Sequence, residues 1–331
     1  MIDIFATLGP ACASDETLKQ MLEAGMTGLR LNLNHGRLPE CMPLITEARA
    51  AARFFGTELK IVCDLQGRSL RIGVLPEPLI LKTGDTVRLG KGGIPVPEAL
   101  LRLSEAPEAF SLSDGRIRLR TLTYGPDTCL CLVTEGGVLE SRKGIAVPGY
   151  ESELPPLTAE DLSALDHMRE AGVYAVMVPF VTERAQLVSV RRELEKRGCG
   201  HIKIWAKLEN RQGLKQLPDW LPEADMCVIA RGDLGNAYPP ETVPALQKHI
   251  ASLCRSARKP FLVATGLLSS LMRQTSPARA DLSDIYNAVL DGAAALMLTD
   301  ETARGAYPVR AVQYLTRTVN TAGQTADTLF Y

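Results

Sequence analysis

Two short apolar runs in the second half of the chain each end in a cation and a carboxylate. Residues 202–209 read Ile-Lys-Ile-Trp-Ala-Lys-Leu-Glu, and residues 226–233 read Met-Cys-Val-Ile-Ala-Arg-Gly-Asp. Their length and composition are typical of buried strands, but core packing does not account for charge at their carboxyl ends. In parallel α/β folds that end is where ligands bind. Glu209 and Asp233, with Lys207 beside them, suit a divalent metal and an anionic substrate.

Strand-like and helix-like patterns alternate along most of the chain, which favours a parallel sheet. Helix start signals separate the strands, with Ser14 or Asp15 as one cap and Thr158 as another. The last helix is expected from about residue 308 to residue 322. The eight predicted strands cover residues 4–8, 28–34, 59–64, 174–180, 201–207, 225–230, 260–265 and 294–299. This alternation predicts an α/β fold, the (β/α)8 or TIM barrel.

The pattern changes after the third predicted strand. Turn-forming stretches such as residues 83–85 and 135–137 separate short alternating runs such as residues 116–119. This is typical of a small all-β domain, inserted here after strand three as a lid. The predicted organisation is a barrel catalytic domain of residues 1–73 and 150–323, a β lid domain of residues 74–149 containing a loop at 94–100, and a tail of residues 324–331.

Composition excludes several classes of partner. The net charge of −1 and the pI near 6.5 give no overall field for nucleic acid or an anionic membrane. The eight cysteines form no Cys-x-x-Cys pair, which favours reduced, buried thiols in a cytoplasmic protein. No run approaches the ~18 consecutive apolar residues that span a membrane, and the N-terminus lacks the pattern of a signal peptide.

Polar side chains gather at the predicted carboxyl ends of the strands, which in a barrel converge on one pocket. They are Arg30, Asn32, Asn34, His35, Asp64, Arg71, Lys207, Glu209, the Ala230–Arg231–Gly232 backbone, Asp233, Thr265, Thr299, Asp300 and Glu301. Cations around acids favour an anion bound with a divalent metal, and the backbone N–H groups of residues 232–235 suit a carboxylate or phosphate. Asp300 and Glu301 are expected to be first-turn acids of the eighth helix.

Several of these residues also have a purely structural interpretation. Arg71 and Glu209 could form a structural ion pair, and Asp64 could be a helix cap or a turn residue. His35 could occupy a turn at positive φ. Thr265 could be a buried hydroxyl that satisfies backbone groups. No single residue decides between these readings; the concentration of so many at one end of a barrel favours a site.

The motifs, taken in order, resemble those of the pyruvate kinase family over roughly residues 3–318. The stretches that carry the resemblance are residues 6–10, 28–36, 64–73, 143–149, 206–210, 230–235, 263–265, 277–280, 287–292 and 297–303. The resemblance implies a cytoplasmic phosphotransferase that moves phosphate between phosphoenolpyruvate and ADP, yielding pyruvate and ATP. It also implies Mg2+ or Mn2+ as cofactor, K+ as a further candidate, and a homodimer formed through the barrel near residues 277–291.

The resemblance further implies a role for each matching residue. The catalytic set is Lys207, Arg30, Arg71 and Thr265; the divalent metal set is Glu209 and Asp233; the monovalent cation set is Asn32, Asn34 and Asp64. Substrate is assigned to Ala230, Arg231, Gly232 and Thr265, nucleotide to His35, Lys143 and Pro10, and the lid to Lys143 with Asp114.

The chain departs from the family pattern around these residues. Asn34 stands where the family has serine, and Gly266 where it has glutamine. The family's Asp-Thr-Lys-Gly-Pro-Glu reads Asp-Leu-Gln-Gly-Arg-Ser at residues 64–69. The lid is shorter than usual, and the family's C-terminal regulatory domain is missing from the match. These differences leave three alternatives open: a metal-dependent, enolate-forming lyase or aldolase, a kinase for another small acid on the same barrel, or a non-catalytic family member.

Overall fold

The computed structural model describes residues 2–113, 115–148, 150 and 155–328, and these residues form two compact units. The barrel unit is made of the described residues of Met1–Gly67, Pro155–Arg231 and Pro244–Tyr331. The β unit is made of those of Arg68–Leu154 and Gly232–Val243. The predicted domain boundaries stay predictions.

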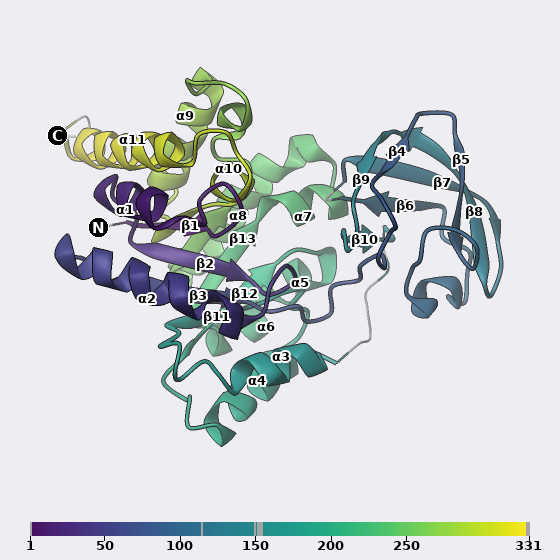
Figure 1. Cartoon of the computed structure of the whole chain (residues 1–331), viewed down its shortest axis with the longest axis horizontal. Helices are drawn as coiled ribbons and strands as arrows, with labels where there is room; N and C mark the ends of the chain where they lie inside the picture. Colours follow the sequence, from purple (N-terminus) through teal and green to yellow (C-terminus); the bar gives the residue numbers. More distant parts are fainter. Residues whose placement is uncertain (1, 114, 149, 151–154, 329–331) are drawn as a thin grey trace. The chain divides into compact units, whose positions relative to one another are not determined.

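Eight parallel strands close into a barrel in the order β1-β15-β14-β13-β12-β11-β3-β2. Figure 1 labels β1, β2, β3, β11, β12 and β13 among them. The strands are β1 (Asp3–Thr7), β2 (Gly28–Asn32), β3 (Lys60–Asp64), β11 (Ala175–Val178), β12 (Lys203–Leu208), β13 (Met226–Ala230), β14 (Phe261–Ala264) and β15 (Ala295–Leu298). Each coincides with a predicted strand to within a few residues at either end. The prediction of an α/β TIM barrel is therefore confirmed.

Helices alternate with the barrel strands along the sequence. They are α1 (Asp15–Glu23), α2 (Leu38–Phe54), α3 (Ala159–Leu165), α4 (Arg184–Lys196), α5 (Arg211–Lys215), α6 (Leu217–Trp220), α7 (Arg231–Ala237), α8 (Val243–Ser256), α9 (Arg279–Leu290), α10 (Asp300–Ala303) and α11 (Pro308–Thr328), with 3-10 turns at Leu221–Glu223, Pro240–Thr242 and Ser269–Met272. Near the two chain ends, α1 and α11 pack against each other (Figure 1). Among the described residues, no helix has the length and apolar character that crossing a bilayer requires.

The predicted helix caps at Ser14 and Thr158 are confirmed. Ser14 Oγ accepts a hydrogen bond from the Thr17 amide at 3.2 Å. Thr158 Oγ1 accepts from the Asp161 amide at 3.0 Å, while the Asp161 carboxylate accepts from the Thr158 amide at 2.9 Å. This reciprocal capping box fixes the start of α3.

Two predictions about helices need correction. Asp300 and Glu301 do not open the eighth barrel helix; they lie in the short extra helix α10, and the barrel helix α11 starts only at Pro308. That helix also runs to Thr328, beyond the predicted end near residue 322.

Alternate residues of each strand fill the barrel interior. The interior cluster includes Phe5, Val62, Trp205 and Val228, and the Phe5 and Trp205 rings meet edge to face with centroids 5.2 Å apart. Because side chains alternate along a strand, every second residue from these positions also faces inward. The apolar centre of the barrel therefore determines which residues face inward at the strand ends, at both mouths of the barrel.

The β unit contains two antiparallel sheets. One has the order β10-β6-β7-β8-β5 and the other pairs β4 with β9. Their strands are β4 (Leu79–Leu81), β5 (Thr86–Gly90), β6 (Ala109–Leu112), β7 (Ile117–Tyr124), β8 (Thr128–Glu135), β9 (Gly137–Leu139) and β10 (Ile145–Ala146).

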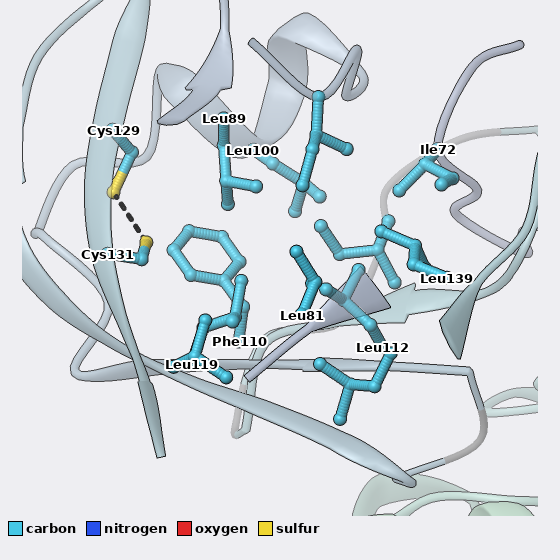
Figure 2. Packing of buried hydrophobic residues seen from close by; sticks show 14 of the residues in the cluster. Ile72, Leu81, Leu89, Leu100, Phe110, Leu112, Leu119, Cys129, Cys131 and Leu139 are labelled. Atoms are coloured by element: carbon cyan, nitrogen blue, oxygen red, sulfur yellow. Dashed lines mark hydrogen bonds between the residues drawn. The ribbon is translucent and has the colours of Figure 1, made fainter. Parts of the chain in front are cut away.

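A compact apolar core holds the β unit together. Figure 2 shows Leu89, Phe110 and Leu119 converging from three strands of the larger sheet. The predicted loop at 94–100 is wrong in part. Its end forms a 3-10 helix, Glu98–Leu101, because Leu100 and Leu101 insert into this core and are at most 5% exposed.

The packing of Phe5 on Gly28 is directly testable. A Cβ added at Gly28 would lie 2.0 Å from Cε1 of the Phe5 ring, so Gly28→Ala is expected to lower the free energy of unfolding by about 1–3 kcal/mol. Urea denaturation measures the loss. Gly36→Ala is the matched control, since its added Cβ would lie 4.0 Å from Glu40 Oε2. Equal stability of the two variants would contradict this packing, and adding Phe5→Leu to Gly28→Ala should recover part of the loss.

Candidate active site

Four charged side chains meet at the carboxyl mouth of the barrel. Arg30 on β2 donates two hydrogen bonds to Asp64 Oδ2 at the end of β3, from Nε at 3.0 Å and from Nη2 at 2.5 Å. Lys207 Nζ on β12 lies 3.3 Å from the same Asp64 oxygen. It also lies 2.7 Å from Oε1 of Glu209, which directly follows that strand. The structure therefore brings together these four predicted site residues.

Burial and charge act in opposite directions on Asp64. Desolvation by burial opposes its ionisation, but the positive charges of Lys207 and Arg30 and their hydrogen bonds outweigh it, and the pKa of the carboxyl is lowered from its ordinary value. The Asp64 side chain is 2% exposed, against 11% for Arg30 and 14% for Lys207. The Asp64 carboxylate is therefore more buried than the two cations that it binds, and it orients both at the carboxyl mouth of the barrel. The alternative reading of Asp64 as a helix cap or turn residue is wrong, because it is the last residue of a buried strand.

Glu209 has the properties of a ligand for a hard cation. Its side chain is 1% exposed, and Oε2 accepts a hydrogen bond from the Phe180 amide at 2.7 Å. Oε1 lies 2.7 Å from the Lys207 ammonium and accepts no further hydrogen bond from the described residues. Carboxylate oxygens of this kind fit Mg2+.

Asp233, the other predicted metal ligand, lies in the first turn of α7, just after β13. It belongs to the β unit, so its pairing with Glu209 stays a prediction. Among the described residues, no group of three or more histidine, cysteine, aspartate or glutamate side chains could hold a metal. Mg2+ commonly binds through one or two carboxylates together with substrate and water, so the predicted two-carboxylate set is compatible with it.

The predicted monovalent cation residues interact with their neighbours. Asn32 Oδ1 accepts hydrogen bonds from the Asn34 amide at 3.1 Å and from Asn34 Nδ2 at 3.2 Å. Asp64, the third residue of that set, binds Arg30 and Lys207 as described. The assignment of these three residues to K+ stays a prediction.

Thr265 occupies a strained turn at the end of β14. Its φ is +77°, in the left-handed region that a β-branched residue rarely adopts, and Gly266 follows at +76°. Its hydroxyl makes no hydrogen bond within the described part of the chain, so the alternative role of satisfying backbone groups is wrong. Its carbonyl oxygen, in contrast, accepts from Arg231 Nε at 3.1 Å and Nη2 at 2.8 Å.

The Arg231 side chain therefore has a positioning role. Besides holding Thr265, its Nη1 donates to Asp284 Oδ1 at 2.6 Å. Because the Arg231 side chain is engaged in these contacts, the backbone of the predicted substrate-binding stretch Ala230–Arg231–Gly232 is the part that can contact a ligand. Ala230 ends β13 and Gly232 lies in the first turn of α7, where backbone N–H groups have no partner within the helix.

Two residues order the site in ways that the sequence did not predict: Thr7 was not named as a site residue, and Glu301 was listed among the polar residues without this role. Thr7, the last residue of β1, accepts a hydrogen bond from Arg30 Nη1 at 3.1 Å and donates to the Leu298 carbonyl at 2.9 Å. Glu301 accepts from the Thr299 amide at 2.8 Å and from the Leu268 amide at 3.3 Å, and so ties the end of β15 to the loop after β14. The position of Thr7 at a strand end was the available signal.

The predicted nucleotide and lid residues are dispersed over the two units. Pro10 lies in the turn after β1, and His35 in the turn after β2. His35 is not among the positive-φ residues of the described chain, so that alternative is wrong. In the β unit, Arg71 Nη1 donates to the Arg142 carbonyl at 2.8 Å, and Lys143 lies 3.0 Å from Glu140. Asp114 lies outside the described residues, and the suggested Arg71–Glu209 pair joins different units and stays a hypothesis.

Comparison with known proteins gives one consistent result. The family model "Pyruvate kinase, barrel domain" matches residues 1–312. The chain is 37% identical over 326 residues to a pyruvate kinase of Agrobacterium vitis, covering 96% of this chain and 67% of the relative. A pyruvate kinase of Aeropyrum pernix is 36% identical, with 96% and 69% covered. The human protein named pyruvate kinase PKLR is 37% identical, with 94% and 58% covered.

The lowered pKa of Asp64 gives a prediction about stability. Asp64→Asn at neutral pH leaves two neighbouring cations with one acid fewer, and we expect a loss of about 3–5 kcal/mol in the free energy of unfolding. A carboxyl whose pKa is depressed in the folded state stabilises the fold at pH values above its unfolded pKa of about 4. This stabilisation is lost as the pH falls through the lower folded pKa. Urea titrations of both proteins should therefore show the deficit shrinking below about pH 4. A deficit independent of pH would show that the Asp64 charge is not responsible.

Proposed function

The chain belongs to the pyruvate kinase family, and from this premise we propose that it transfers a phosphoryl group between phosphoenolpyruvate and ADP with a divalent metal. The observation that carries the proposal is the cluster of Arg30, Asp64, Lys207 and Glu209 at the carboxyl mouth of the barrel. The prediction of a member of a phosphotransferase family is confirmed at that level. Substrate, metal and residue roles are parts of the proposal.

The cluster suits phosphoryl transfer for an electrostatic reason. The migrating phosphoryl group spreads negative charge over its oxygens, so catalysis depends mainly on positioned cations. Arg30 and Lys207 present two, and each is held in place by Asp64 before substrate arrives. Thr7 adds a hydrogen bond that fixes the Arg30 guanidinium. Because the cations need not reorient during the reaction, their full interaction is available to the transition state.

The remaining residues complete the proposed chemistry. A divalent ion held by Glu209 and Asp233 would neutralise charge on the substrate oxygens. The backbone of Ala230–Arg231–Gly232 would bind the substrate carboxylate. When the phosphoryl group leaves phosphoenolpyruvate, the enolate carbon takes up a proton, and the Thr265 hydroxyl lies on the proposed path. Arg231 maintains the strained backbone that aims this hydroxyl.

The nucleotide and K+ roles complete the set. We assign Arg71 to the transferred phosphate and Pro10, His35 and Lys143 to the nucleotide. Asn32, Asn34 and Asp64 are assigned to K+. The amide at position 34 still offers a carbonyl oxygen, the ligand type that hard monovalent ions accept.

A second candidate function is a metal-dependent lyase, an aldolase or a kinase for another small acid. Gln66, which stands where the family has lysine, donates from Nε2 to the Leu33 carbonyl at 3.0 Å, so it has a structural role here. Calorimetry separates the two functions. Binding of both oxalate and ADP in the presence of Mg2+ is expected for the kinase, and binding of oxalate without ADP favours the alternative.

Location and assembly follow from the same reasoning. All eight cysteines lie within the described residues and none is paired in a disulfide, including Cys129 and Cys131, whose sulfurs lie 3.5 Å apart (Figure 2). Free thiols are typical of a reducing compartment, so we propose a cytoplasmic protein. We also propose a homodimer through residues 277–291, which include all of α9.

Lys207→Met tests the main proposal. Removing this cation should lower kcat for phosphoenolpyruvate and ADP by about 10²–10³-fold, the usual effect of losing one electrostatic donor to a transition state. A coupled assay of pyruvate formation with Mg2+ measures it. Lys215→Met, at an exposed lysine of α5, is the matched control and should leave kcat unchanged. Near wild-type turnover by Lys207→Met would remove Lys207 from the reaction.

Substituting the proposed metal ligands gives a separate prediction. Glu209→Gln and Asp233→Asn each remove one anionic oxygen donor, so each should raise the Mg2+ concentration for half-maximal activity by about tenfold or more. The measurement is a Mg2+ titration of activity, with direct Mn2+ binding as a second readout. An unchanged metal requirement for either variant would show that its carboxylate is not a ligand.

A further inference from the structure

A second set of cations lies at the opposite end of the barrel strands. Lys60 is the first residue of β3, Lys203 is the first of β12, and Tyr174 directly precedes β11, which pairs with both strands. Because the strands are parallel, these residues occupy the amino mouth, whereas Asp64 and Lys207 occupy the carboxyl mouth. The alternation that turns Val62 and Trp205 inward also places Lys60 and Lys203 on the inward-facing side.

These residues line a cavity of about 440 Å3, a volume within the usual range for small-molecule sites. The last two turns of α2 contribute Arg49 and Arg53, which are one helical turn apart and therefore on one face. Thr57, Glu58 and His201 also line the cavity. The cavity lies wholly within the barrel unit.

The charge of this cavity is unbalanced. Four permanent cations line it, namely Arg49, Arg53, Lys60 and Lys203, and Glu58 is its single acid within the described residues. Lys60 is bound to Asp3 at 2.7 Å, outside the lining. Burial and then the charge of Arg53 lower the pKa of the Arg49 guanidinium, so the protein itself disfavours this concentration of positive charge.

The cations are held in place by other groups. Arg49 Nη2 donates to the Gly172 carbonyl at 2.6 Å, and Lys203 Nζ donates to the Tyr174 hydroxyl at 2.8 Å. The ammonium groups of Lys60 and Lys203 also lie 5.4 Å and 4.8 Å from the centre of the Tyr174 ring. Exposed cations near a helix end are usually solvated individually, but here two strands and one helix direct four of them into one cavity.

We propose that the amino mouth of the barrel binds a small organic oxyanion with two or more negative charges, of the phosphate monoester class. A doubly charged anion would offset the two positive charges that remain when Glu58 and Asp3 are counted against the four cations. A phosphate group also accepts the forked hydrogen bonds that Arg49 and Arg53 offer.

The amino-mouth site is separate from the catalytic cluster. The rings of Phe5 and Trp205 fill the barrel interior between the two mouths, and Tyr174 packs edge to face on Trp205 with centroids 6.3 Å apart. Binding at the amino mouth therefore does not rest on the proposed phosphotransfer, and an inactive variant can test it.

The experiment measures binding of inorganic pyrophosphate by calorimetry, without divalent metal, in a Lys207→Met background. That background removes an active-site cation and leaves Asp64 and Glu209 to repel anions at the carboxyl mouth. Adding Arg53→Gln and Lys203→Gln should weaken binding by about tenfold or more, as expected for the loss of two unit charges close to the ligand. Glu58→Gln should tighten binding, because it removes the acid of the lining.

Lys19→Gln with Arg317→Gln is the matched control, since both residues lie on the barrel unit away from this cavity and the net charge changes equally. Arg53 and Lys203 are exposed, so their substitution should leave the thermal midpoint unchanged. Equal weakening by the two double variants would show non-specific attraction and overturn the proposal. Failure of pyrophosphate to bind the Lys207→Met protein at low salt would also overturn it.

Discussion

The buried carboxylate of Asp64 organises the catalytic end of this barrel. It accepts two hydrogen bonds from Arg30 and lies 3.3 Å from Lys207, so one acid fixes two cations contributed by different strands. A buried ion cluster of this kind adds little net stability, because desolvation of the charges cancels much of their attraction. Its contribution is preorganisation: without Asp64 the two cations would repel each other and turn toward water.

Local backbone strain is the second constraint on the site. A threonine with φ of +77° costs on the order of 1–3 kcal/mol and persists only where the surroundings enforce it. The two hydrogen bonds from Arg231 to the Thr265 carbonyl, with Arg231 itself held by Asp284, provide that enforcement. Backbone strain that is maintained at the end of a barrel strand indicates a functional role, because an unstrained backbone would allow equally good packing.

The sequence predicted the fold better than it predicted individual contacts. Apolar runs and caps such as Thr158 are local signals, and the strands and helix starts they indicate are present. Lys207 and Glu209 were identified because charge at the end of a buried strand is costly. Thr7 was missed, because its partners Arg30 and Leu298 come from other strands and a hydroxyl carries no local signal. The substrate assignment of Arg231 concerned its backbone and stays a prediction. The hydrogen bonds from its side chain to Thr265 were not predicted, because side-chain direction depends on tertiary packing.

The assignment of Asp300 and Glu301 failed for a related reason. Acids before an apolar stripe are typical of a first turn, and these two do lie in one, but Gly305 and the following residues interrupt the helix before α11 begins. A Cβ at Gly305 would lie 2.4 Å from the Glu301 carbonyl oxygen, so the chain requires glycine where α10 ends. Glu301 then accepts hydrogen bonds from the Thr299 amide after β15 and from the Leu268 amide in the loop after β14, a role that no local sequence pattern indicates.

The two mouths of the barrel share strands β3 and β12, and this limits how they can influence each other. Lys60 and Asp64 are four residues apart, which corresponds to about 13 Å along a strand. That exceeds the Debye length of about 8–10 Å in physiological salt, although the apolar interior screens less than water does. The remaining electrostatic effect of an anion at the amino mouth opposes anion binding at the carboxyl mouth. Its negative charge disfavours the ionised form of Asp64 and repels a second anion. An anion at the amino mouth could therefore assist catalysis only by changing the position of these shared strands, since its field acts in the opposite direction.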